Sequence, residues 1–134
     1  ALGEVMHEVS IMSSIIDSVL EELRKHQVER VEEVYLTLGS LTFLGEEQLQ
    51  FAYDVLSKGT QLEGSRLVIE KEDVEVRCRS CGYQGPADHV EEIFHGLVPV
   101  LQCPECGEDV EVTKGKSCTV RSIRVVEKDV SVQG

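Results

Sequence analysis

The sequence predicts an α/β protein in which a small β-sheet with two α-helices is interrupted by a ribbon-like module built around four cysteines. Apolar residues recur at helical spacing in two segments, alternate as in strands between and after them, and give way to two Cys-x-x-Cys-Gly motifs. The length of 134 residues and the 41% apolar content suit one compact domain or two small ones. We therefore expect an α/β part at residues 1–73 and 119–134, and a cysteine-rich part at residues 74–118.

The first helix is indicated by one apolar stripe with steps of three and four residues. Its members are Val9, Met12, Ile15, Ile16, Val19, Leu20 and Leu23. Ser10 or Ser13 is expected to cap the start of this helix. The basic run 24–26, which ends with His26, follows where cations suit a helix C-terminus.

Strands and a second helix follow along the chain. Val34, Leu36 and Leu38 alternate with polar or amphipathic residues and predict a half-buried strand that ends at Gly39. Residues 46–57 predict a helix with Leu49, Ala52, Tyr53 and Leu56 on one side, and Gly59 as its stop. Apolar residues at 67–76 predict one or two more strands, and those at 120–126 predict a last strand that returns to the sheet.

The paired cysteines carry the strongest chemical signal. Cys78 and Cys81 form one Cys-x-x-Cys-Gly turn, and Cys103 and Cys106 form the other. Each turn can aim two sulfurs at one ion, so two turns make a tetrahedral thiolate site with no open position. Twenty-one residues, 82–102, separate the pairs, slightly more than in the usual zinc pattern. The pattern predicts a structural zinc ion, Zn(2+), and opposes a redox dithiol, which needs only one such motif.

Cys118 and the histidines leave two interpretations each. Cys118 is either a small residue at the edge of the last strand or a reactive or metal-binding thiol. His7 stands before the predicted first helix, and His89 and His95 lie in the acidic insert between the cysteine pairs. From pattern alone, each of these histidines is a solvated surface residue or a metal ligand.

Composition bounds the partners and the compartment. The formal net charge of −12 repels nucleic-acid phosphates and anionic membrane surfaces, so we expect neither as a partner. The sequence has no apolar run of about 20 residues for a membrane span and no signal-peptide pattern at its start. We therefore expect a cytoplasmic protein with reduced thiols, as a monomer or a homodimer.

Three features occur in one order and resemble the HypA family of nickel metallochaperones. They are the Met6-His7-Glu8 sequence, the run from Gln50 to Leu67 with Phe51-Ala52-Tyr53 and Lys58-Gly59-Thr60, and the two Cys-x-x-Cys-Gly motifs. The similarity extends from Met6 to about Glu127. The resemblance implies a protein that performs no chemistry and supplies nickel, Ni(2+), for maturation of nickel-iron hydrogenase and, in some organisms, urease.

The resemblance also implies ligands and partners. His7 would bind nickel through its imidazole, Glu8 through its amide or as a supporting carboxylate, and Met6 as the usual start of the chain. His95 or His89 would add a ligand from the insert, and the four cysteines would match the family's zinc site. The implied partners are a nickel-binding GTPase and the hydrogenase large subunit.

Residues 1–5 depart from the family pattern, because the family normally begins at the methionine that corresponds to Met6. Here the nitrogen of Met6 is bonded to Val5, so it is not a free amine.

Two other functional classes compete with nickel delivery. One is a zinc-ribbon adaptor that binds nucleic acid, which the acidic balance opposes, and the other is a zinc-stabilised protein-interaction module.

Overall fold

The chain divides into two compact units. The structure, a computed structural model, describes residues 2–87 and 101–128, with side chains from His7 onward. The first unit, called here the helical unit, comprises Ala1–Thr37, Leu44–Glu70 and Thr119–Gly134. The second, called the cysteine unit, comprises Leu38–Phe43 and Lys71–Cys118. The cysteine unit is thus inserted into the sequence of the helical unit.

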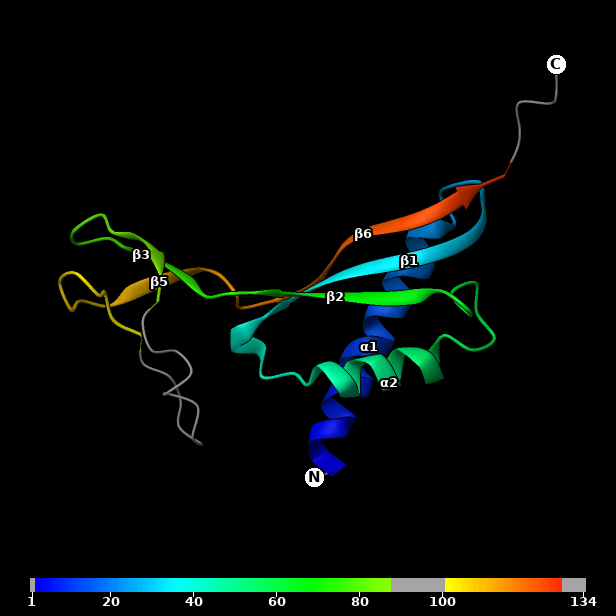
Figure 1. Ribbon diagram of the computed structural model, residues 1–134, viewed down its shortest axis with the longest axis horizontal. Coiled ribbons are helices and arrows are strands. Elements are labelled where there is room, and N and C mark those ends of the chain that lie inside the picture. The colour runs from blue at the N-terminus through cyan, green and yellow to red at the C-terminus, as the bar shows by residue number, and fades with distance from the viewer. Residues whose placement is uncertain (1, 88–100, 129–134) are drawn as a thin grey trace, which may run out of the picture. The chain divides into compact units, whose positions relative to one another are not determined.

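The helical unit contains two helices and most of a three-stranded sheet. The helices are α1 (Leu2–Leu23) and α2 (Glu46–Leu56), and the strands are β1 (Val28–Gly39), β2 (Arg66–Glu72) and β6 (Cys118–Glu127). The strand order is β2-β1-β6, as Figure 1 shows. The Lys128 N–H donates to the Gln27 carbonyl beyond one end of the β1–β6 pair, and the Gly39 N–H donates to the Ser117 carbonyl at the other. β6 therefore runs antiparallel to β1, which confirms a last strand that rejoins the sheet.

The core of the helical unit follows the predicted apolar patterns. Met12, Ile16, Val19 and Leu23 are buried along α1, and the other predicted members of the stripe are partly buried. α2 packs on α1 and buries Leu49, Ala52 and Tyr53. The Tyr53 hydroxyl lies 2.5 Å from Ser65 Oγ, so the largest buried side chain satisfies its polar atom inside the core.

Two boundaries differ from the predictions. α1 begins at Leu2, so Ser10 and Ser13 lie inside the helix instead of capping it, and His7 is a helical residue. Serine is only mildly unfavourable inside a helix, and Glu, Met and Leu before it favour helix, so nothing stops α1 at Ser10. β1 starts at Val28, six residues before Val34. The prediction missed this start because Val28, Val31 and Val34 are buried at steps of three, which hides the alternation expected of a strand.

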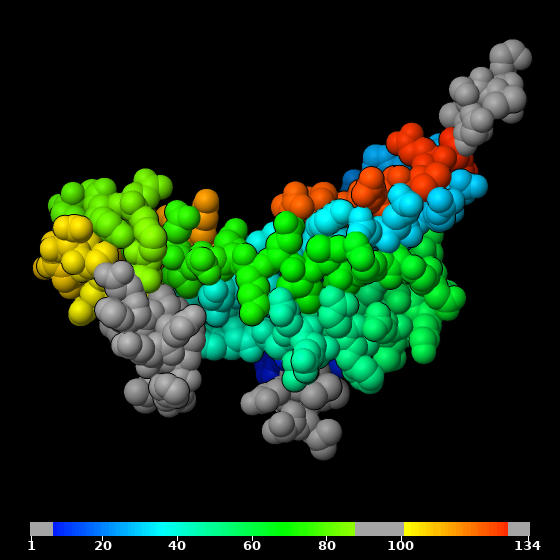
Figure 2. Space-filling view, viewed as in Figure 1, coloured from blue at the N-terminus to red at the C-terminus, as the bar shows by residue number. Residues whose placement is uncertain are grey.

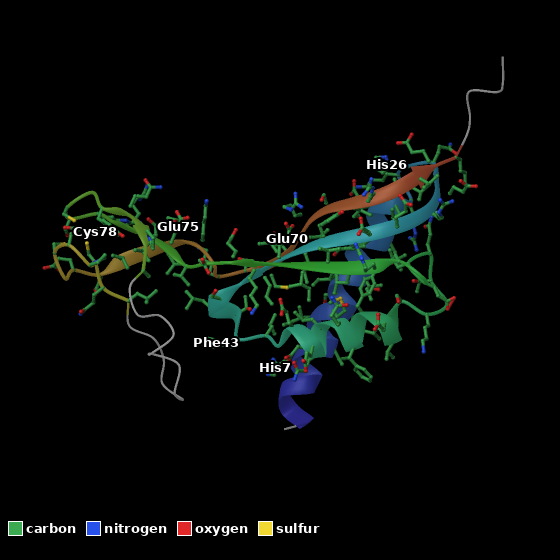
Figure 3. All side chains as sticks on the ribbon, viewed as in Figure 1. His7, His26, Phe43, Glu70, Glu75 and Cys78 are labelled. Atoms are coloured by element: carbon green, nitrogen blue, oxygen red, sulfur yellow. The ribbon has the colours of Figure 1, made fainter. Side chains whose placement is uncertain are left out.

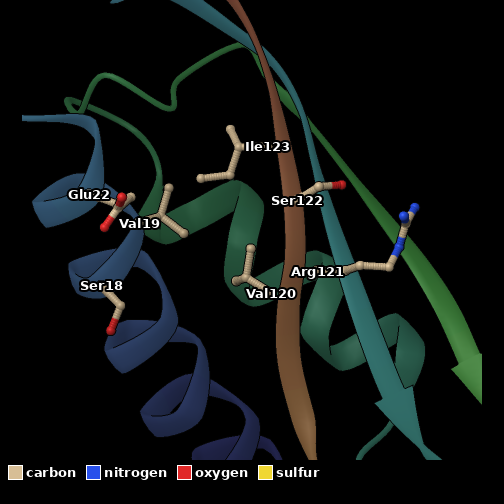
Figure 4. A pocket seen from close by; sticks show the side chains of 7 residues that line it. All are labelled: Ser18, Val19, Glu22, Val120, Arg121, Ser122 and Ile123. Carbon is tan, nitrogen blue, oxygen red and sulfur yellow. The ribbon is translucent and has the colours of Figure 1, made fainter. Parts of the chain in front are cut away.

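A shallow groove lies between α1 and the edge strand β6. It has a volume of about 330 Å³, and Val19 lies opposite Val120 and Ile123 across it (Figure 4). The apolar residues of β6 are only partly buried, whereas Val34 and Leu36 on β1 are fully buried. The helices therefore cover the centre of the sheet more completely than its β6 edge.

The cysteine unit contains a second sheet with the strand order β4-β3-β5. Its strands are β3 (Glu75–Cys78), β4 (Gln84–Pro86) and β5 (Val110–Lys114), and both neighbours of β3 are antiparallel to it. Val76 of β3 is buried opposite Val112 of β5. Arg77 and Glu111 face each other across the same pair, with a 3.1 Å hydrogen bond.

Backbone segments cross closely where the chain enters and leaves the cysteine unit. A Cβ atom at Gly39 would lie 2.4 Å from the backbone of Gly115, and one at Gly115 would lie 2.8 Å from Val74 Cα. Leu41 N–H donates to the Gly115 carbonyl, and Gly115 N–H donates to Glu72 Oε1. The one-turn helix η1 (Ser40–Thr42) starts at this crossing. The approach of these segments requires residues without a side chain.

Alanine substitutions at three glycines should separate the packing cost from the cost of backbone conformation. Gly39→Ala should destabilise through collision alone, because φ of −73° suits alanine. Gly59→Ala should cost only about 1–2 kcal/mol of strain, since its φ is +77° and no atom lies within 4 Å. Gly115→Ala combines both penalties and should cost the most. Urea unfolding of the three variants measures this order, and a smaller loss for Gly39→Ala than for Gly59→Ala would contradict the close crossing.

Candidate metal sites

The four predicted zinc ligands come together in the cysteine unit. Each of Cys78, Cys81, Cys103 and Cys106 offers a sulfur, and all four sulfurs lie within 4.8 Å of one another. The Cys78–Cys106 sulfurs are 3.5 Å apart and the Cys81–Cys103 sulfurs are 3.6 Å apart. These separations are far too long for disulfides and close to the edge of about 3.8 Å in a tetrahedron with Zn–S bonds of about 2.3 Å. The cluster therefore fits a zinc ion.

The two cysteine turns have matching backbone geometry. Gly82 N–H donates to the Cys78 carbonyl, and Gly107 N–H donates to the Cys103 carbonyl. The N–H of Cys78 in turn donates to the carbonyl of Tyr83, and Cys103 N–H bonds in the same way to the carbonyl of Glu108. Both glycines have φ near +80°, which allows the chain to fold back under the sulfurs. The repeated motif thus produces a repeated turn.

The sulfurs compete for protons when no cation is bound. A hydrogen bond from the Cys81 backbone N–H, opposed by desolvation and aided by the Cys106 thiol, lowers the pKa of Cys78 to about 7. The Glu108 N–H lowers the pKa of Cys106, but desolvation and hydrogen bonds with the other three cysteines outweigh it and raise the pKa to about 12. The neighbouring sulfurs cannot all be negative, so a divalent cation is the species that allows four thiolates here.

The predicted nickel residues lie at the start of α1. His7 is exposed, whereas Glu8 is only 4% exposed, and Glu8 Oε2 accepts a 2.9 Å hydrogen bond from the Gly45 N–H. Gly45 is the N-cap residue of α2, so the carboxylate lies at the positive end of that helix. Figure 3 shows His7 on α1 close to α2. The His7 imidazole is exposed to solvent, while the Glu8 carboxylate is engaged within the helical unit.

Other predicted residues are placed as follows. The backbone of Met6 is in α1, and His89 and His95 lie outside the described residues. Cys118 is the first residue of β6 and is partly buried, and this burial raises the pKa of its thiol. Among the described residues, the cluster that could hold a metal ion consists of Cys78, Cys81, Cys103 and Cys106. Cys118 is not part of it. His26 follows α1, and its Nε2 lies 3.6 Å from Glu22 Oε1.

The bond from Gly45 to Glu8 is a feature that sequence reasoning missed. The two residues are 37 positions apart, and no periodic pattern connects them. The usual signal for a capped helix start is a side chain at the N-cap or three residues after it, and Gly45 has no side chain. The acceptor instead comes from a different helix.

Removing the Glu8 carboxylate should therefore destabilise the helical unit. Glu8→Ala leaves the Gly45 N–H without its acceptor and is expected to cost about 1–3 kcal/mol in the free energy of unfolding. Glu8→Gln keeps an acceptor oxygen and should cost less. Asp17→Ala, at an exposed acid on the same helix, is the matched control and should change stability by less than about 0.5 kcal/mol. Equal stability of Glu8→Ala and Asp17→Ala would argue against the link.

Comparison with known proteins gives this arrangement a family. Residues 6–125 match the family model described as HypA, hydrogenase/urease nickel incorporation, metallochaperone. The hydrogenase maturation factor HypA of Methanothermobacter thermautotrophicus is 40% identical, with 92% of this chain and 100% of that protein covered. The factor of the same name from Methanopyrus kandleri is 35% identical, with 90% and 93% covered.

A solved structure also shares the fold. The solution structure of the Ni metallochaperone HypA from Helicobacter pylori matches with a TM-score of 0.65 and 20% identity, over 90% of this chain and 98% of that one. None of the helices in the described segments is long and apolar enough to cross a membrane. With the family match covering most of the chain and four cysteines gathered at one point, the chain belongs to the HypA family of metallochaperones of hydrogenase maturation, which are not enzymes.

Proposed function

We propose that this protein binds Ni(II) reversibly and delivers it during maturation of nickel-iron hydrogenase, with urease as a second acceptor where one is present. The observation that carries the proposal is an exposed His7 at the N-terminal end of α1 in a chain of this family. A site at a helix end can exchange its ion with another protein more easily than a closed cage can. Reversible release is what delivery requires.

The proposed nickel ligands are the His7 imidazole and backbone nitrogens around Met6 and Glu8. Nitrogen-rich, square-planar coordination is the geometry that Ni(II) favours. The engaged carboxylate of Glu8 supports the amide of Glu8 as the ligand rather than its side chain. His7 and Glu8 are the sixth and seventh residues of α1, so a regular helix commits their N–H groups to carbonyls four residues earlier. Amide coordination therefore requires the first turns of α1 to unwind.

Zinc has a different role in the proposal. Zn(II) held by Cys78, Cys81, Cys103 and Cys106 has no open position, so it would fix the fold of the cysteine unit and take no part in delivery. A ligand from His95 or His89 to nickel stays a prediction, because the insert that carries them lies outside the described residues. The division of the metals between the two parts of the chain is part of the same proposal.

The proposed partners are the nickel-binding GTPase of hydrogenase maturation and the hydrogenase large subunit. The family assignment supports them, because hydrogenase maturation is the process named for the relatives. The proposed compartment is the cytoplasm, where reducing conditions keep four neighbouring thiols available for zinc.

Replacing His7 should abolish specific nickel binding without changing zinc content. Calorimetry on zinc-loaded protein should show one nickel site in the parent chain and in His26→Ala, and none in His7→Ala. His26 is the matched control because it is also an exposed histidine beside α1. The affinity for nickel should decrease as the pH is lowered, since protons compete with Ni(II) for the imidazole and amide nitrogens. If His7→Ala bound nickel as well as the parent chain does, the assignment of His7 as a nickel ligand would be wrong.

Two further measurements on the same samples report the ligand set. Nickel should lower the helical circular dichroism signal if amides of α1 bind the ion, because those turns must unwind. Removing Ala1 to Val5 should tighten binding if a free Met6 amine is a ligand. An unchanged helical signal with nickel bound would exclude amide ligands from α1.

Zinc should bind once per chain and depend on each of the four cysteines. Cys103→Ser is expected to lose zinc and unfold the cysteine unit, whereas Cys118→Ser should retain zinc because Cys118 is outside the cluster. Zinc lowers the pKa of the thiols it binds, so stability from zinc is present at neutral pH and is lost as pH falls and protons displace the metal. Chelator-detected zinc release during acid titration measures this, and a full zinc content in Cys103→Ser contradicts the site.

A further inference from the structure

α2 exposes an apolar pair on the face that points away from the core. Phe51 is 62% exposed and Val55 is 47% exposed. They are four residues apart, so they lie on one side of the helix, while Leu49, Ala52 and Tyr53 are buried on the other. The remaining large apolar side chain with high exposure among the described residues is Phe43, at 60%, in the cysteine unit. Figure 2 shows residues of α2, in turquoise and green, on the visible surface of the helical unit.

Two acidic residues adjoin the Phe51 end of this pair, and the exposed Lys58 follows Val55 by three residues. Glu47 precedes Phe51 by one helical turn and Asp54 follows it by three residues, so both are neighbours of Phe51 on the helix surface. Both are exposed, and no ion pair of either is recorded among the residues described. The protein as a whole carries a net charge of −12. The pair and its two acidic neighbours, Phe51, Val55, Glu47 and Asp54, are called here the α2 face.

The α2 face is near the proposed nickel residue. Glu8, next to His7, is bonded to Gly45 at the N-cap of α2 over 2.9 Å. Phe51 is six residues further along, which corresponds to about 9 Å of helix rise. A protein that rests on the α2 face is therefore brought within reach of an ion at His7.

We propose that the α2 face is the surface on which a nickel acceptor docks, and that it receives an amphipathic helix with Lys or Arg beside its apolar stripe. This inference rests on the proposed nickel-delivery function. A row of side chains spaced i, i+4 is the ridge that fits the groove of another helix. The apolar pair supplies the buried contact, and the acidic residues select a basic partner. A second copy of this chain is disfavoured, because it would place Glu47 and Asp54 against the same acidic surface.

The test uses full-length zinc-loaded protein and a synthetic probe. The probe is a fluorescent amphipathic peptide of about 20 residues with a Leu stripe flanked by Lys, and its control has Glu in place of each Lys. Anisotropy at about 50 mM salt should show binding of the Lys peptide and not of the Glu peptide, with weaker binding at about 500 mM. Phe51→Ser combined with Val55→Ser should weaken binding by at least about 10-fold.

Two more variants make the test specific. Glu47→Lys combined with Asp54→Lys should reverse the preference toward the Glu peptide. Phe43→Asn, which removes an equally exposed phenylalanine and suits the left-handed φ of +59°, should leave binding unchanged. The proposal is overturned if the Lys peptide does not bind, if it binds the serine variant as tightly as the parent, or if both peptides bind alike.

Nickel and self-association are measured on the same variants. The serine variant should bind nickel as the parent does, because neither replaced residue is a proposed ligand. If the parent protein binds the Lys peptide but no nickel, nickel delivery is refuted while the docking surface stands. The two failures can therefore be told apart. Sedimentation would show whether the parent protein forms a dimer that the serine substitutions abolish. Such a result would assign the α2 face to a second copy of the chain and overturn the proposal of a basic partner.

Discussion

The convergence of four cysteine sulfurs is the constraint on which the cysteine unit depends. Within its described residues, the buried apolar side chains besides cysteine are Leu38, Val74 and Val76. Three such side chains contribute only about 1.5–3 kcal/mol each, which is little against the chain entropy of ordering the unit. Structural zinc in small domains supplies apparent binding energies of about 10–16 kcal/mol at neutral pH. The strands and the two cysteine turns are therefore arranged around four potential ligand sulfurs more than around an apolar core.

Charge pairing explains why this protein is poorly suited to bind phosphates. Most cations of the described part of the chain already face carboxylates: Arg24–Glu21, Lys25–Glu22, Arg66–Glu33, Arg77–Glu111, Arg79–Glu111, Lys114–Glu75, Arg121–Glu70 and Arg124–Glu33. The guanidinium of Arg121 also lies over the ring of Tyr35. Nucleic-acid binders gather unpaired Lys and Arg in one patch, which this distribution does not provide. The acidic surplus instead favours metal ions and basic protein surfaces.

The sequence predicted the elements whose signal is local. The helix at Glu46–Leu56, the end of β1 at Gly39 and the grouping of the four cysteines each follow from spacing within a short window. The start of α1 was missed because Ser10 looks like a cap but is tolerated inside a helix. The Glu8–Gly45 bond and the Gly39–Gly115 approach join segments 37 and 76 residues apart, so no local pattern could reveal them. Their discovery needs the fold.

The insertion of the cysteine unit also sets an order of events during synthesis. β1 ends at Gly39 and β6 begins at Cys118, so the ribosome releases the centre of the three-stranded sheet long before its last edge. Until then the nascent helical unit exposes the side of β1 that β6 will cover, and contacts this distant in sequence form slowly. Folding of the intervening residues shortens the loop that must close, which lowers its entropy cost. Under the proposed function, a cell short of zinc would accumulate chains with an unfinished sheet, and its zinc supply would limit the number of nickel carriers.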